Sequence, residues 1–261
     1  MSMEMAQGEG ASQTPRAHEL TPTAPWIWLA RGWADYQRAP VLCAGYGLLF
    51  VAIGYAIFLG LGALGLMAAI PVAIGAFALL GPLAATGLYA LAREFERGEK
   101  PGWRDMVFVR AASPMQVAYL GVFLMIGLFI WTLCALTLLV IFAVRADIPA
   151  GEFMDFAIGT TRGLSLLTIG TLVGGVIAFA IYAVSAFSIP MLIDRQTNFA
   201  TAMAASVNTV KEQPKPMLLW AWIIAGSVAV GAVTLLFAFV ILFPLIGLAT
   251  WHGYRDAFGG Q

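Results

Sequence analysis

Two long apolar runs constrain this chain more than any other feature of its sequence. Residues 41–92 and 217–254 contain no Asp, Glu, Lys or Arg, and the second run is 38 residues long. As one helix it would reach about 57 Å at about 1.5 Å per residue, whereas the hydrocarbon core of a bilayer is about 30 Å thick. Each run therefore predicts two membrane-spanning helices joined by a turn.

The overall composition agrees with a membrane protein that crosses the bilayer several times. Hydrophobic residues make up 61% of the chain and charged residues 11%, whereas soluble domains have about 45–50% and about 25%. So few charges cannot cover a water-soluble surface, which excludes a soluble enzyme, a disordered protein and a coiled coil. Lys plus Arg and Asp plus Glu are each 14, so we expect no nucleic-acid partner.

Turn signals and run lengths predict six spans in one membrane domain, residues 25–258. Residues 60–65 are rich in glycine and divide the first run, and residues 231–234 divide the last. The expected spans are 41–59, 67–91, 115–144, 164–192, 217–233 and 235–254. Residues 1–24 show no cleaved signal-peptide pattern, and we expect them to form a disordered cytoplasmic tail.

The basic residues are unevenly distributed between the predicted loops. Eleven of the 14 lie before the first span, between the second and third, between the fourth and fifth, or after the sixth. They are Arg31, Arg38, Arg93, Arg97, Lys100, Arg104, Arg110, Arg195, Lys211, Lys215 and Arg255. The opposite side has Arg145 and Arg162. The positive-inside rule then predicts a bacterial inner-membrane protein with both termini in the cytoplasm.

The segments before the odd-numbered spans resemble one another. Residues 32–35 read Gly-Trp-Ala-Asp and residues 102–105 read Gly-Trp-Arg-Asp, and each motif precedes a proline and a span. Residues 199–212 precede the fifth span without this motif, but their apolar residues recur at helical spacing. The fold expected is an all-α bundle of three pseudo-repeated hairpins, each preceded by an interfacial amphipathic helix.

Four further motifs carry a family resemblance over residues 26–258. They are residues 33–40 (WADYQRAP), 81–91, 96–101 and 249–256 (ATWHGYRD). The chain resembles a bacterial family of predicted integral membrane proteins of unknown function whose members are often labelled cytochrome c oxidase subunit I. The resemblance implies six spans and an inner-membrane location, but no reaction. A haem–copper oxidase needs several His ligands, whereas His252 is the one histidine near a predicted span, so we expect no catalytic oxidase subunit.

Stripes of small residues are the candidate helix-docking sites. They recur at four-residue spacing in the first, fourth and fifth spans: Ala52, Ala56, Gly60, Gly170, Gly174, Ala178, Ser227 and Gly231. Such stripes allow two helices to approach closely. They can serve packing within the bundle, or they can dock another membrane protein where they face outward.

Aromatic and charged residues at the predicted span ends are candidate interface anchors. They are Trp33, Arg38, Arg93, Trp103, Arg195, Trp251, His252 and Arg255. The opposite charges that follow the even-numbered spans could instead form a gate around a central axis. His252 could bind a cofactor or sense pH, but its aromatic neighbours favour a place in an aromatic belt.

Two function classes remain open. The first, which we favour on the sequence, is a non-catalytic accessory or assembly subunit that docks on a larger membrane complex, such as a respiratory or other energy-transducing one. The second is a channel or facilitator for a small uncharged or lipidic molecule, with a hollow or polar path near Pro82, Pro190 and Pro244. No nucleophile–base pair and no metal-ligand set is visible, so we expect neither an enzyme nor a bound cofactor.

Overall fold

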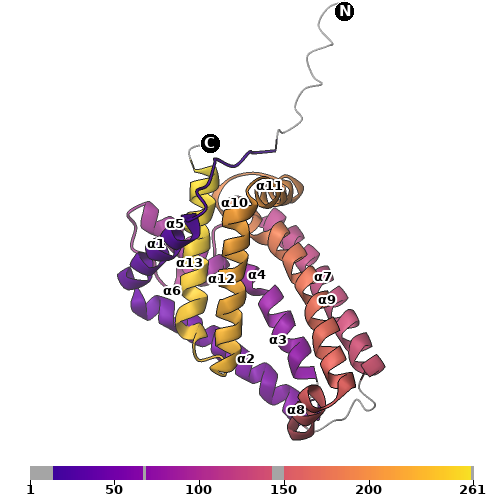
Figure 1. Cartoon of the computed structure of the whole chain (residues 1–261). Helices are drawn as coiled ribbons and strands as arrows, with labels where there is room; N and C mark the ends of the chain where they lie inside the picture. The colour runs from indigo at the N-terminus through magenta and orange to yellow at the C-terminus, as the bar shows by residue number, and fades with distance from the viewer. Residues whose placement is uncertain (1–13, 67–68, 143–149, 260–261) are drawn as a thin grey trace, which may run out of the picture.

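The computed structural model describes residues 14–66, 69–142 and 150–259, and within them the chain is built from α-helices and short turns (Figure 1). Residues 1–13 of the expected tail, and Arg145 of the third loop, lie outside the described residues. The tail expectation is wrong for the part that follows, because the His18 amide donates to the Ala257 carbonyl at 2.8 Å and Leu20 is buried. This segment packs against the bundle.

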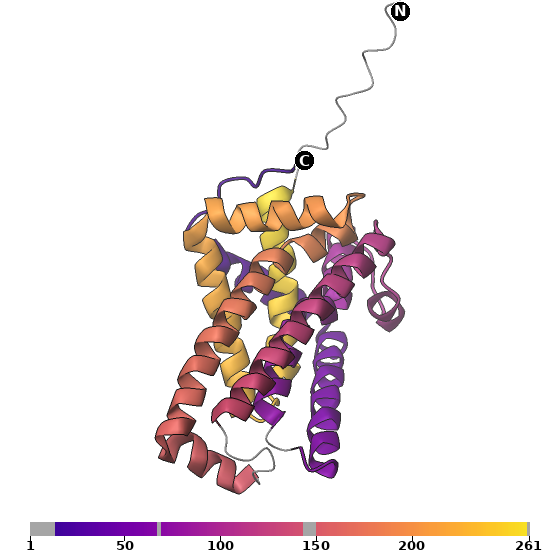
Figure 2. The same ribbon diagram turned by 90° about the vertical axis from the view of Figure 1, so that its right-hand side faces the viewer.

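Thirteen helices follow one another in the described residues. They are α1 (Ala24–Arg38), α2 (Pro40–Ala63), α3 (Ile70–Leu79), α4 (Gly81–Ala84), α5 (Thr86–Glu96), α6 (Trp103–Val107), α7 (Pro114–Phe142), α8 (Ala150–Gly159), α9 (Thr161–Ser185), α10 (Ser188–Asp194), α11 (Phe199–Glu212), α12 (Pro214–Val233) and α13 (Phe239–Phe258). Figure 2 shows α11 lying across one end of the bundle, while α7 and α9 run side by side along it.

Four helices of the described chain are long and apolar enough to cross a membrane: α2, α7, the continuous stretch Thr161–Asp194, and α12. The spans expected at 67–91 and 235–254 are not among them. The first is divided into α3, α4 and α5, each shorter than a bilayer crossing requires. The second coincides with α13, which is 20 residues long but carries charged residues in its last two turns.

Both apolar runs divide near the expected positions. After α2 the chain turns at Gly65, whose φ of +71° suits a residue without a side chain. After α12 the turn is formed by Leu235 and Leu236, which also have positive φ, and the Leu236 amide donates to the Gly231 carbonyl at 2.7 Å. This bond satisfies a carbonyl that the end of α12 would otherwise leave unpaired.

Prolines interrupt two of the predicted even-numbered spans. Pro190 follows the break between α9 and α10, and Pro82 follows the end of α3. Proline lacks an amide hydrogen and its ring displaces the carbonyl four residues earlier, so helices tend to end before it. Pro244 lies inside α13, which stays helical from Phe239 to Phe258.

The helices that precede the odd-numbered spans differ in length. The helices α1 and α11 have 15 and 14 residues, whereas α6 has five. In α11 the Asn198 carboxamide accepts from the Thr201 amide at 2.7 Å, and in α6 Asp105 accepts from the Gly102 amide at 2.9 Å. Both are helix N-terminal caps.

The centre of the bundle is α13, which packs against α1, α2 and α5. Two glycines allow close approach. A Cβ on Gly32 of α1 would lie 2.8 Å from the Ala249 nitrogen, and one on Gly47 of α2 would lie 2.7 Å from the Val240 Cα. Because these neighbours are backbone atoms, a side chain at either position would push the helices apart.

Candidate functional site

An apolar cleft of about 870 Å³ lies between α2, α3, α4, α5, α9, α12 and α13. We call it the cleft. Its inner wall includes buried residues from five helices and the turn before α5: Phe50, Leu79, Ala85, Tyr89, Ser185 and Trp220. Its rim includes exposed apolar residues: Ile57, Ile74, Phe179, Leu218, Trp222 and Leu235. Figure 1 shows α9 and α12 diverging away from α10 and α11.

The polar atoms of the cleft are almost all engaged with the protein. The Tyr182 hydroxyl donates to the Met217 carbonyl at 2.7 Å, and the Tyr55 hydroxyl donates to the Leu235 carbonyl at 2.8 Å. The hydroxyls of Ser185, Ser227 and Thr250 each donate to a carbonyl four residues earlier in their own helix. Among the residues that the structure describes, no Asp, Glu, Lys, Arg or His lines the cleft. Its walls are therefore suited to uncharged, largely apolar contents.

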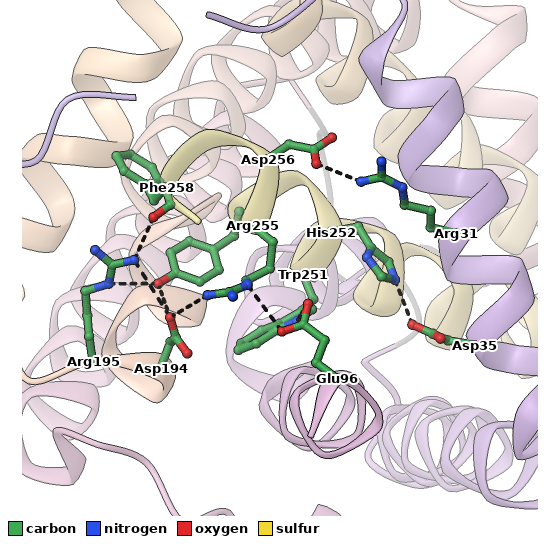
Figure 3. Close-up of polar contacts among 11 residues, drawn as sticks. Arg31, Asp35, Glu96, Asp194, Arg195, Trp251, His252, Arg255, Asp256 and Phe258 are labelled. Carbon is green, nitrogen blue, oxygen red and sulfur yellow. Dashed lines mark hydrogen bonds and ion pairs between the residues drawn. The ribbon is translucent and has the colours of Figure 1, made fainter. Parts of the chain in front are cut away.

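A second feature is a cluster of charged and aromatic side chains around the C-terminal half of α13 (Figure 3). It lies at the end of the bundle where the described chain begins and ends (Figure 1). We call it the charged cluster. Its members come from α1, α5, α10 and α13: Arg31, Asp35, Glu96, Asp194, Arg195, Trp251, His252, Tyr254, Arg255 and Asp256. Helices far apart in the sequence are thus joined through α13.

Arg255 connects the ends of α5 and α10. Its Nε lies 3.2 Å from Glu96 and its Nη1 lies 3.3 Å from Asp194. The same two carboxylates accept from aromatic residues of α13, since Trp251 donates to Glu96 at 3.0 Å and Tyr254 to Asp194 at 2.6 Å. Each carboxylate therefore has a cationic and a neutral donor, and Asp194 also lies 3.8 Å from Arg195, an arrangement that fixes its position.

The Asp35 carboxylate forms the other side of the charged cluster. Its Oδ2 lies 2.7 Å from His252 Nε2, and its Oδ1 accepts from Arg38 at 2.9 Å. Asp35 is 4% exposed, so these partners compensate for a carboxylate removed from water. Burial also raises the pKa of the neighbouring Tyr36, which keeps that phenol neutral. The Gly-Trp-x-Asp motifs thus have different roles, because Asp105 caps α6 whereas Asp35 holds α1 to α13.

Arg93 joins three segments close to the charged cluster. It lies on α5, and its guanidinium donates to the Ile193 carbonyl of α10 at 2.6 Å and to the Arg110 carbonyl at 2.9 Å. It also lies 3.4 Å from Glu94. At 6% exposure Arg93 is buried. It therefore connects two backbone segments inside the protein.

The predicted interface anchors divide into two groups. Trp33 and Trp103 are exposed, at 42% and 43%, as contact with headgroups requires. Trp251 and Arg93 are buried, so the expectation that they contact lipid headgroups is wrong for these two. Arg195 donates to the Phe258 carbonyl of α13. His252 contacts Asp35 of α1, and Arg255 contacts Glu96 of α5. Arg38 lies over the Phe95 ring. The charges after the even-numbered spans serve contacts between helices.

The small-residue stripes also divide. Gly174 packs against the Trp131 ring and Gly231 against the Phe239 ring, so both serve packing within the bundle. Ala178 and Ser227 line the cleft. Ala52, Ala56 and Gly60 are exposed on α2, and a Cβ on Gly60 or Gly170 would have no neighbour within 4 Å among the described residues.

The hollow path expected near Pro82, Pro190 and Pro244 has a counterpart at the first of these, because Pro82 lines the cleft together with Gly81 and Ala186. Pro190 and Pro244 are not among its described lining residues. Most contacts in the charged cluster were not predicted. Glu96 and Asp194 follow apolar spans, but nothing in their spacing indicates that Arg255 connects them. Within the described residues, no group of three or more His, Cys, Asp or Glu side chains is placed to hold a metal ion.

Comparison with known proteins gives one match. The model of a family described as "Predicted integral membrane protein (DUF2189)" matches residues 69–194, which extend from the start of α3 to the end of α10. No curated protein and no solved structure matches the chain. The chain is thus similar to an integral membrane family whose description names no activity. This match and the four apolar helices place the protein in a membrane.

Proposed function

We propose that α3–α5 and α13 also cross the bilayer, which gives six spans in three repeated hairpins, with both termini in the cytoplasm of an inner-membrane protein. The helix order supports this, because α1, α6 and α11 each precede two apolar segments. The charged cluster supports it as well. Arg255, Glu96 and Asp194 lie at the ends of three even-numbered segments, and Arg255 contacts both carboxylates, so these ends share one side.

Reporters of membrane sidedness test this topology. A reporter inserted after Glu99 and another fused after Gln261 should both report the cytoplasm, because six spans return the chain there each time. A reporter inserted after Gly65 should report the periplasm and serves as the opposite-side control. A periplasmic signal at Glu99 would remove the second span, and one at Gln261 would remove the sixth.

We infer that the protein is a non-catalytic facilitator that takes an uncharged or lipidic molecule from the bilayer into the cleft. The observation that carries this proposal is the size and lining of the cleft, which has about 870 Å³ and no charged side chain among its described lining residues. Small-molecule sites typically have about 300–1,000 Å³ and mainly apolar walls. The exposed apolar rim provides an entrance from the lipid side, so a hydrocarbon can enter without leaving an apolar environment.

Filling the cleft should abolish this binding. Gly175 of α9 lines the cleft, and a Cβ there would meet no atom within 4 Å, so Gly175→Phe adds a ring without a clash. We expect photolabelling of the inner wall by a diazirine-bearing hexadecane, in nanodiscs, to fall at least about tenfold, since burial of several methylenes is lost at about 0.8 kcal/mol each. Gly170→Phe on the same helix is the matched control, because Gly170 has equal space but does not line the cleft.

A second candidate is the accessory or assembly subunit, and the exposed stripe Ala52, Ala56 and Gly60 on α2 favours it. Close helix approach at such a stripe would hold a neighbouring membrane complex. The same experiment separates the candidates. An accessory subunit would give hexadecane adducts on the rim and outer faces alone, equal in Gly175→Phe and wild type, and would co-purify with a stoichiometric membrane partner in gentle detergent.

A further inference from the structure

One hydroxyl in the wall of the cleft has no hydrogen-bond partner among the described residues. Tyr89 lines the cleft from α5 and is 2% exposed, and no hydrogen bond joins its hydroxyl to another described residue. The indole Nε1 of Trp220 on α12 is also unpaired, but it is fully buried and not accessible from the cleft. Largely buried polar groups are hydrogen-bonded in the great majority of cases, so the Tyr89 hydroxyl indicates a partner in the cleft that completes it.

The neighbouring cations do not reach the cleft. Arg93 lies one turn after Tyr89 on α5, and its guanidinium donates to the Ile193 and Arg110 carbonyls and faces Glu94, while its buried Nε has no partner among the described residues. Arg195 donates to Tyr254 and to the Phe258 carbonyl. Neither arginine lines the cleft, and no other basic side chain does so in the part of the chain that the structure describes. An ionised phosphate or carboxylate would therefore lose its hydration without gaining a countercharge, which is strongly unfavourable.

We propose that the cleft binds an uncharged lipid that has one long hydrocarbon chain and a hydroxyl or carbonyl oxygen, and that the Tyr89 hydroxyl donates a hydrogen bond to this oxygen. This inference rests on the proposed binding function and adds the class of ligand. Tyr89 lies on the inner wall, whereas the rim side chains Ile57, Ile74 and Phe179 are wholly apolar. The ligand therefore enters with its oxygen innermost and its chain toward the rim.

The test compares three probes of equal chain length, each with a diazirine: hexadecane, hexadecanol and hexadecanoate, the last kept ionised. The purified full-length protein in nanodiscs is photolabelled and the adducts are located by mass spectrometry. We expect hexadecanol to label the cleft most strongly. When the diazirine stands next to the carbon that bears oxygen, its adducts should lie near Tyr89.

Conservative variants identify the donor. Tyr89→Phe removes one oxygen atom, and we expect it to leave hexadecane labelling unchanged. Hexadecanol labelling should fall about three- to tenfold, because the loss of one hydrogen bond lowers affinity by about this factor. Tyr55→Phe is the matched control, because Tyr55 also lines the cleft but its hydroxyl is paired with the Leu235 carbonyl.

The outcomes distinguish this inference from the proposal beneath it. If no probe labels the inner wall, both the facilitator and the ligand class are wrong. If hexadecane and hexadecanol label equally, or Tyr89→Phe and Tyr55→Phe behave alike, the facilitator stands and the oxygen-bearing ligand does not. Preferential labelling by hexadecanoate would overturn the inference of an uncharged ligand, because it would require a cation that reaches the cleft.

Discussion

Replacing Arg93 by Gln is expected to lower the thermal unfolding midpoint in detergent by about 10 °C. Breaking a buried charged network costs about 3–5 kcal/mol. Each kcal/mol lost from the free energy of unfolding shifts the midpoint of a domain of this size by about 2–4 °C. The shorter side chain cannot reach both carbonyls that the guanidinium contacts, those of Ile193 and Arg110. It also leaves Glu94, which is 14% exposed, without its buried cation.

The matched control for this change is Arg97→Gln, one helical turn further on. Arg97 also lies near Glu94, at 3.6 Å, but its side chain is 54% exposed. Exposed ion pairs contribute about 0–1 kcal/mol, so we expect a shift within about 3 °C. The measurement is the intrinsic fluorescence of both purified variants during heating. Equal midpoints for the two variants would mean that Arg93 is a headgroup anchor and that its contacts to α10 contribute little.

Arg93 also shows how far the sequence could predict the candidate site. Charges at the ends of apolar spans are visible in the sequence, and the expectation of interface anchors follows from the general behaviour of such residues. Which charge meets which depends on the angles at which helices cross. The contacts of Arg255 with Glu96 and Asp194 bridge 159 and 61 residues of sequence respectively, and no local pattern encodes them.

The helices themselves were largely predictable. Run length, the glycine-rich turn before Gly65 and the division after Val233 all correspond to helix ends in the structure. The breaks around α4, and the short length of α6, were not expected. A helix in a bilayer is apolar on its lipid face and on its packed face alike. Its periodicity therefore does not distinguish the inner wall of the cleft from the lipid-facing surface.

The small residues illustrate the same limit at single positions. Gly174 and Gly170 stand one turn apart on α9, yet Gly174 packs against Trp131 and Gly170 has no neighbour within 4 Å among the described residues. Both have the same spacing in the sequence. Whether a glycine is required depends on which backbone or aromatic ring packs against it. These neighbours are set by the assembly of the helices and not by local spacing in the sequence.

Gly47→Leu is expected to be among the most damaging single changes in the first span. A Cβ at Gly47 would lie 2.7 Å from the Val240 Cα of α13, with carbonyl oxygens of Phe239 and Val240 also in its way. These atoms belong to the backbone and cannot rotate aside. Overpacking typically costs about 1–3 kcal/mol and more where the backbone must move, so we expect the thermal midpoint to fall by at least about 5 °C.

Gly60→Leu is the matched control, because it makes the same change on the same helix where a Cβ has no neighbour within 4 Å among the described residues. It should leave the midpoint and the size-exclusion profile unchanged. If Gly47→Leu alone lowers both, the α2–α13 contact holds the wall of the cleft in place, since Phe50 of α2 stacks on Phe243 of α13 one turn further along. If both variants behave like wild type, α2 and α13 do not approach closely in the folded protein. The cleft wall formed by Phe50 and Phe243 would then have no fixed position, and the ligand site proposed there would lose its support.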